Sequence, residues 1–212
     1  MYSQVPGLVL GFHGCDQDVA AAVVAGRAEL KPSKNDYDWL GHGTYFWEFN
    51  PQRAREFAEE RAKDPRGSSN IKKPAVLGAV IELGYCLNLA DSSYIDVLRI
   101  AYQGFEQVMD IAGQPLPANK PQGQDALRRT LDCAVIEYLH ASNHHAAKSD
   151  PDSSRRRFDS VRGVFPEGRQ LYEGAGFWEK THVQICIRNP NCIKGYFLPR
   201  SMNRRYPRPG AG

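Results

Sequence analysis

The sequence lacks the features that mark a membrane-spanning or disulfide-linked secreted chain. Nowhere among its 212 residues do eighteen apolar residues follow one another, so we expect no transmembrane helix. No basic segment precedes the short apolar run near the N-terminus, which argues against a signal peptide. The five cysteines are odd in number, scattered and without a C-x-x-C pair, so neither a disulfide framework nor a zinc site is indicated. We expect reduced thiols, no bound metal and a cytoplasmic location.

Several familiar catalytic signatures are also missing. We find no Ser-His-Asp signature, no phosphate-loop motif, no internal repeat and no low-complexity tract. What is present is an ordinary globular composition, with 42% hydrophobic and 24% charged residues. The length suits a single domain over residues 1–212.

Charge is unevenly distributed along the chain. Residues 1–150 carry 15 Lys and Arg against 19 Asp and Glu, whereas residues 151–212 carry 12 against 5. The basic part includes the "RRR" run at 155–157 and a C-terminal tail at about 200–212. Such a patch can meet the phosphates of a cofactor or a nucleic acid, and a solvated loop and tail is an equally good interpretation.

Strand-like and helix-like patterns alternate in the first half of the chain. A buried strand is predicted at 8–12, ending at His13, and a helix after the N-cap residue Asp16. Aromatic residues predict a strand at 44–48, and Asn50 followed by Pro51 predicts the start of a helix. A β-rich segment follows at 75–90.

The second half begins with a helical block and returns to strands. Helices are expected near 92–111 and 124–141, and a polar segment that we expect to be mobile follows at 143–157. Three strand-like segments complete the chain, at 158–165, 181–189 and 192–198. This order predicts an α+β domain with a split sheet and an inserted helical pair within about 92–157.

Three residues attract attention as candidates for chemistry. His13 lies at a predicted strand end, Tyr45 follows the glycine pair in "LGHGTYFWEF", and Gln184 interrupts the alternation of a late strand. The glycines suit either a turn into a buried aromatic strand or a flat wall that a planar ligand approaches closely. None of the three is specific alone, because a structural histidine and a core tyrosine are common.

The order of the motifs resembles the ADP-ribosyltransferases of the diphtheria-toxin and poly(ADP-ribose) polymerase class. The matching segments, in chain order, are "GFHG", "GHGTYF", "NPQRAREFAEE", "AVLGAVIELG", "FDSVRGVFPEG" and "VQICIRNPNCIKGYFL". The region around 92–157 has no counterpart and is interpreted as an insertion. The resemblance implies an ADP-ribosyltransferase-like split antiparallel sheet with flanking helices, and NAD as the co-substrate.

The resemblance also implies roles for individual residues. His13 would hydrogen-bond the ribose next to the nicotinamide, and the backbone of Gly14 would hold the nicotinamide amide. Tyr45 would stack on the nicotinamide ring, with Gly43 allowing the close approach and Phe57 as the second stacking aromatic. Such stacking contributes about 0.5–1.5 kcal/mol beyond area burial. The small hydroxyl residue common in the family is not evident, since Arg53 and Ala54 fill those positions.

The larger departure from the family pattern is Gln184, which takes the place of a catalytic glutamate. A glutamine keeps the hydrogen bond to the ribose but not the negative charge that stabilises an oxocarbenium-like transition state. Three interpretations stay open: help from Glu179 or Glu173, a slow or mono-specific transferase, or NAD binding without chemistry. Polymer synthesis is not expected.

The segment "EGAGFWEKTH" is predicted to present the acceptor. Phe177 and Trp178 could stack on a base, Glu179 could act as a general base, and His182 could contact the acceptor. A hairpin capped by aromatics and a buried structural histidine are the alternatives. The basic residues nearby favour a nucleic acid, RNA or DNA, over a protein side chain.

The sequence thus predicts an NAD-dependent mono-ADP-ribosyltransferase of bacterial toxin or effector type. A neutralising antitoxin partner is conceivable in that case. The alternatives are a non-catalytic NAD or ADP-ribose-binding module, an NAD glycohydrolase and, last, an RNA 2′-phosphotransferase.

Overall fold

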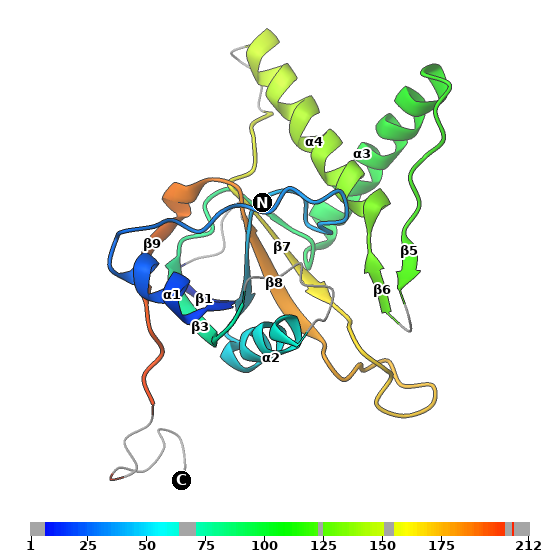
Figure 1. Cartoon of the computed structure of the whole chain (residues 1–212). Coiled ribbons are helices and arrows are strands. Elements are labelled where there is room, and N and C mark those ends of the chain that lie inside the picture. Colours follow the sequence, from blue (N-terminus) through cyan, green and yellow to red (C-terminus); the bar gives the residue numbers. More distant parts are fainter. Residues whose placement is uncertain (1–6, 64–70, 123–124, 151–154, 202–204, 206–212) are drawn as a thin grey trace.

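The computed structural model describes residues 7–63, 71–122, 125–150, 155–201 and 205. Most of the basic tail at about 200–212 therefore lies outside the described residues. Within them the fold is mixed α and β, with one seven-stranded, mostly antiparallel sheet, a two-stranded sheet and four α-helices (Figure 1).

The seven-stranded sheet has the order β4-β7-β8-β2-β1-β3-β9, in which only the β4–β7 pair is parallel. Its strands are β1 (Val9–Asp16), β2 (Thr44–Glu48), β3 (Pro74–Ile81), β4 (Cys86–Asn88), β7 (Ser160–Phe165), β8 (His182–Ile187) and β9 (Ile193–Phe197). The two-stranded sheet consists of β5 (Lys120–Gln122) and β6 (Asp125–Arg128).

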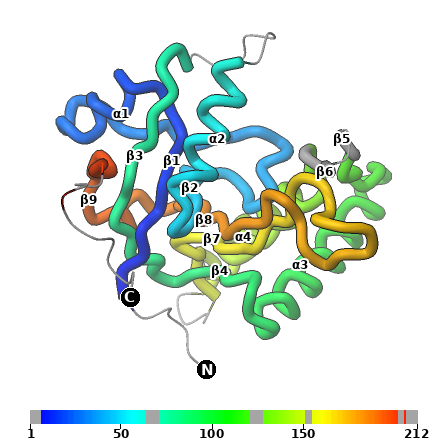
Figure 2. The backbone as a smooth tube through the Cα atoms, turned by 90° about the horizontal axis from the view of Figure 1, so that it is seen from below, coloured from blue at the N-terminus to red at the C-terminus, as the bar shows by residue number. Residues whose placement is uncertain are grey.

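The helices fall into two groups on different parts of the sheet. The first group is α1 (Gln17–Val24) and α2 (Pro51–Ala62), which pack on β1 and β3. The second is α3 (Ser92–Ile111) and α4 (Thr130–Ser149), which pack on each other. Figure 2 shows α3, α4, β5 and β6 gathered on the side of the sheet away from α1. A shared core of α3, α4, β4, β7 and β8 side chains joins this group to the sheet.

Local sequence signals set two helix starts as predicted. The Asp16 carboxylate accepts from the backbone N–H of Asp18 at 2.9 Å, which confirms it as the N-cap of α1. The Asn50 side chain accepts from the backbone N–H of Arg53 at 2.9 Å, with Pro51 in the first turn of α2.

Three predicted boundaries were wrong. The first strand does not end at His13 but continues to Asp16, because β3 pairs with β1 along its whole length. The helix expected at 124–141 begins only at Thr130, after β6, and ends at Ser149. The polar residues 143–149 are therefore helical, because buried Leu139, His140 and Asn143 extend the packed face while the polar side chains mostly face solvent.

The register of the central strands creates an opening in the sheet. β1 pairs with β3 over eight positions but with β2 at only two, Gly11↔Glu48 and Phe12↔Trp47. Beyond Phe12 the backbones of β1 and β2 no longer pair, and the His13 side chain bridges them by a 2.8 Å hydrogen bond to the carbonyl oxygen of Tyr45. The two predicted site residues therefore lie where the strands part.

Candidate functional site

A pocket of about 320 Å³ lies beside this opening. It brings together five of the residues predicted from the sequence, which come from β1, β2, the turn before β2, α2 and β8: His13, Tyr45, Gly43, Phe57 and Gln184. The remaining lining residues are Lys31, Ser33, Asn35, Tyr37, Asp38, Trp39, Trp47, Arg53, Arg61, Phe165 and Glu167. Aromatic walls with a few polar groups are typical of small-molecule sites.

His13 is held in one tautomer. Its Nδ1–H donates to the Tyr45 carbonyl oxygen at 2.8 Å, which leaves Nε2 as a hydrogen-bond acceptor. Burial lowers the pKa of the imidazole, so the neutral form is favoured. A neutral ring fixed in this way can accept a hydrogen bond from a ligand hydroxyl.

Tyr45 is pinned at its hydroxyl end. The hydroxyl donates to the carbonyl oxygen of Gly41 at 2.8 Å and accepts from the backbone N–H of Leu40 at 3.0 Å. Burial raises the pKa of Tyr45 far above its usual range, so the phenol stays protonated. The ring is thus fixed in place as a flat wall of the pocket.

The two glycines of the "GHG" turn are required by protein neighbours. Gly41 has a φ of +77°, and a Cβ there would lie 2.6 Å from the side chains of Glu137 and Ile136. A Cβ on Gly43 would lie 2.5 Å from Sγ of Cys186 and the carbonyl oxygen of Ile187. Close packing of this turn against α4 and β8 therefore fixes where Tyr45 stands.

α4 and the residue after β8 together hold the peptide groups on both sides of His42. The backbone N–H of His42 donates to Oε1 of Glu137 at 2.8 Å, and Nη1 of Arg188 donates to the His42 carbonyl oxygen at 3.0 Å. Glu137 and Arg188 pair with each other through both carboxylate oxygens. The Arg188 guanidinium, the His42 N–H and the His42 ring keep the pKa of Glu137 below its usual value despite burial, which alone would raise it.

Gln184 is oriented by a tryptophan that sequence reasoning missed. Its Oε1 accepts from Nε1 of Trp39 at 2.6 Å, so the amide nitrogen is the group left to donate to a ligand. Trp39 lies in a polar loop, and nothing in its neighbours along the chain signals a partner 145 residues away.

A buried ion pair was also missed. Arg53 is only 4% exposed, and its Nη2 donates to Oε1 of Glu167 at 2.6 Å. The guanidinium lies 6.0 Å from the centroid of the Trp47 ring. Nε and Nη1 of Arg53 have no hydrogen-bond partner within the described part of the chain. Burial raises the pKa of Glu167, and Arg53 opposes that shift.

Other predicted site residues lie outside this pocket. Glu179 pairs with Arg169, Nη2 to Oε1 at 3.0 Å, and this pairing lowers the pKa of the carboxyl group. Phe177 is 66% exposed, and Trp178 forms an isolated β-bridge with Gln170. The loop therefore closes on itself like a hairpin, the alternative weighed for this segment.

His182 and Gly14 occupy structural positions. The His182 ring is buried between Trp47 and Phe165, and its Nδ1–H donates to the Lys180 carbonyl oxygen at 2.6 Å. Gly14 lies directly under α2, where a Cβ would be 2.1 Å from the carbonyl oxygen of Ala54. Neither residue is among those that line the pocket.

Comparison with known proteins finds a relative that covers most of the chain. The chain is similar to an archaeal protein. The uncharacterized protein MJ0359 of Methanocaldococcus jannaschii is 26% identical over 200 residues, covering 86% of this chain and 83% of that protein. No family model matches the chain, and no solved structure matches it.

None of the helices that the structure describes is long and apolar enough to cross a membrane. Among the described residues, no group of three or more His, Cys, Asp or Glu side chains is arranged to hold a metal ion.

Proposed function

We propose that this protein is an NAD-dependent mono-ADP-ribosyltransferase, which releases nicotinamide and transfers ADP-ribose to an acceptor. One observation carries the proposal. His13, Tyr45 and Gln184, chosen from short motifs far apart in the sequence, line one pocket together with Gly43 and Phe57. Motif order alone does not require these side chains to meet, so their convergence supports the site.

Several features of the pocket support NAD as its ligand. The fixed ring of Tyr45 would stack on the nicotinamide, and Nε2 of His13 would accept a hydrogen bond from a ribose hydroxyl. Three cationic side chains line the same pocket and would face the diphosphate: Lys31, Arg53 and Arg61.

The uncharged side chain of Gln184 favours slow transfer of a single ADP-ribose unit. The Gln184 amide can donate to the ribose, but it brings no negative charge to a developing oxocarbenium ion. The two carboxylates that line the pocket are already engaged, Asp38 by Asn35 and Glu167 by Arg53. Weak charge stabilisation suits a mono-transferase better than a polymerase.

For the acceptor we favour a nucleic-acid base. The loop between β7 and β8 leaves the pocket wall at Phe165 and carries the exposed aromatic Phe177 together with Arg169 and Lys180. Exposed aromatics beside cations suit stacking on an unpaired base.

A second function, NAD binding without chemistry, is favoured by Gln184 itself, because the amide keeps the hydrogen bond and lacks the charge. The same assay separates this module, an NAD glycohydrolase and a transferase.

The test is nicotinamide release from NAD by the purified protein, with NAD binding measured in parallel. Total RNA, DNA or buffer alone is added, and Tyr45→Ala, Tyr45→Phe and Gln184→Ala are compared. We expect release that depends on a nucleic acid, is lost in Tyr45→Ala and is largely kept in Tyr45→Phe, whose ring still stacks. Release without an acceptor indicates a glycohydrolase, binding without release indicates the module, and absence of NAD binding refutes the proposal.

A further inference from the structure

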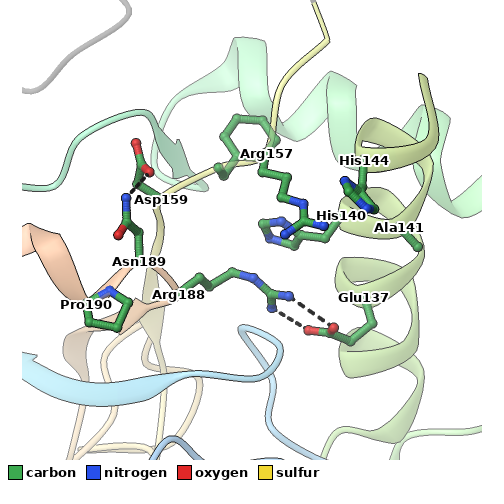
Figure 3. A pocket seen from close by; sticks show the side chains of 10 residues that line it. Glu137, His140, Ala141, His144, Arg157, Asp159, Arg188, Asn189 and Pro190 are labelled. Atoms are coloured by element: carbon green, nitrogen blue, oxygen red, sulfur yellow. Dashed lines mark hydrogen bonds and ion pairs between the residues drawn. The ribbon is translucent and has the colours of Figure 1, made fainter. Parts of the chain in front are cut away.

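A second cavity, of about 550 Å³, lies between α4 and the ends of β7 and β8. Figure 3 shows its side chains, which come from three segments: Glu137, His140 and His144 on α4, the residues 157–159, and the residues 188–190 after β8. None of its lining residues belongs to the pocket that contains Tyr45.

The carboxylates of this cavity are already satisfied. Glu137 is paired with Arg188, and Nη2 of Arg188 lies 3.1 Å from Oε2 of Glu137. Asp159 accepts from the backbone N–H of Tyr85 at 2.9 Å and from Nδ2 of Asn189 at 2.8 Å. Both carboxylates thus already accept hydrogen bonds from protein groups. Apart from Arg188 and Asn189, the other polar side chains that line the cavity offer donor groups without such partners among the described residues.

Those donors are Arg157 and two histidines. No carboxylate in the described part of the chain lies within ion-pair distance of the exposed Arg157 guanidinium. In Figure 3 the Arg157 side chain reaches toward His140 and His144, which are four residues apart on the same face of α4.

His140 provides the strongest evidence that the cavity binds a ligand. It is 5% exposed, yet its Nε2 has no hydrogen-bond partner among the described residues. Burial, more than the nearby Arg188, lowers its pKa to about 3, so the ring is neutral and carries one N–H. Buried polar atoms in folded proteins are nearly always paired, and an exception at a cavity wall indicates a missing partner.

We propose that this cavity binds a phosphate monoester. The Arg157 guanidinium would pair with the phosphoryl oxygens, and the imidazoles of His140 and His144 would donate to them. The volume exceeds what a phosphate group needs and falls within the range of small-ligand pockets, so the rest of the ester also has room. This inference does not depend on the proposed transferase function.

The test is calorimetric titration of the full chain with inorganic phosphate, ribose 5-phosphate and AMP, with adenosine as the uncharged comparison. We expect saturable binding of the phosphate-bearing probes and at least tenfold weaker binding in Arg157→Gln and in His144→Gln. His145→Gln is the matched control, because His145 is also exposed but bonds Ser149 and does not line the cavity. Tighter binding of both monoesters than of inorganic phosphate supports the proposal, and tighter binding of AMP than of ribose 5-phosphate assigns the site to a nucleotide.

A second measurement keeps the two pockets distinct. Phosphate should shift the imidazole NMR signals of His140 and His144 and leave those of His145 unchanged, and Tyr45→Ala should not alter phosphate binding. Four results would overturn the inference: no saturable binding, inorganic phosphate binding as tight as that of the two monoesters, adenosine binding as tight as AMP, or affinity that falls in Tyr45→Ala and not in Arg157→Gln.

Discussion

The buried pair between Arg53 and Glu167 makes a quantitative prediction about stability. The substitution Glu167→Gln keeps the shape of the side chain and removes its charge. Arg53 is 4% exposed, and the 2.6 Å contact with Glu167 is its closest ion pair. The other two carboxylates near its guanidinium, Glu56 and Glu60, are each 3.8 Å away.

The magnitude follows from these distances. Leaving one charge of a buried ion pair without its partner typically costs about 3–5 kcal/mol. Two terms reduce that cost here: Glu56 and Glu60 still attract the guanidinium through partly exposed side chains, and the desolvation that raises the pKa of Glu167 is relieved. We therefore expect the free energy of unfolding to fall by about 2–3 kcal/mol.

Urea unfolding followed by tryptophan fluorescence measures this change, because Arg53 lies over the Trp47 ring. Glu56→Gln is the matched control, since its partly exposed side chain should contribute less than about 1 kcal/mol. If the two substitutions cost the same, the assignment of Arg53–Glu167 as a dominant buried pair is incorrect. The double variant Arg53→Met, Glu167→Met should recover most of the loss, because it leaves no uncompensated charge.

Further predictions concern the site, the packing of α2 and the pH dependence. Under the proposed function, Gln184→Glu should speed nicotinamide release at least tenfold, because the restored charge would lower the activation free energy by about 1.4 kcal/mol or more. Unchanged release would argue against a cationic transition state there. Gly14→Ala should lower the free energy of unfolding by about 2–3 kcal/mol, because its Cβ meets the Ala54 carbonyl oxygen, whereas Gly176→Ala, with no atom within 4 Å, should change little. Burial lowers the pKa of His182 to about 4, below its unfolded value, so stability is present above the unfolded pKa and is lost as pH falls. Between pH 7 and 5 the free energy of unfolding should fall by about 2 kcal/mol more in the wild-type chain than in His182→Gln, because the buried His13 and His140 contribute equally to both.

Local signals in the sequence predicted local structure well. Asp16 and Asn50 cap the helices that they were expected to cap, because capping depends on a side chain and an N–H two or three residues away. The predicted end of the first strand was wrong because the true end is fixed by pairing with β3, about 60 residues further along the chain. The predicted end of α4 was wrong because the polar residues there continue a helix whose other face is buried, and the sequence pattern alone did not reveal that face.

The same division holds for the candidate site. His13, Tyr45 and Gln184 could be selected from motif order, and they line one pocket. Trp39 and Glu167 could not be selected in this way, since their partners lie 145 and 114 residues away in the sequence and only the folded structure brings them into contact. Glu179 was chosen for its charge in a promising loop, but its neighbour Arg169 engages that charge.

The hydrogen bonds of Glu137 and Arg188 to the backbone of His42 give the helical segment a structural role in the candidate site. A turn with a glycine on each side is intrinsically flexible, and here the backbone N–H and the carbonyl oxygen of its central residue, His42, are held by a residue of α4 and by the residue that follows β8. The helical segment that looks like an addition to the domain therefore acts as a brace for the wall that carries Tyr45. A chain without this segment would keep every lining residue supplied by β1, β2 and β8. It would lose the Glu137 contact, and the turn before Tyr45 would no longer hold the ring in a fixed position.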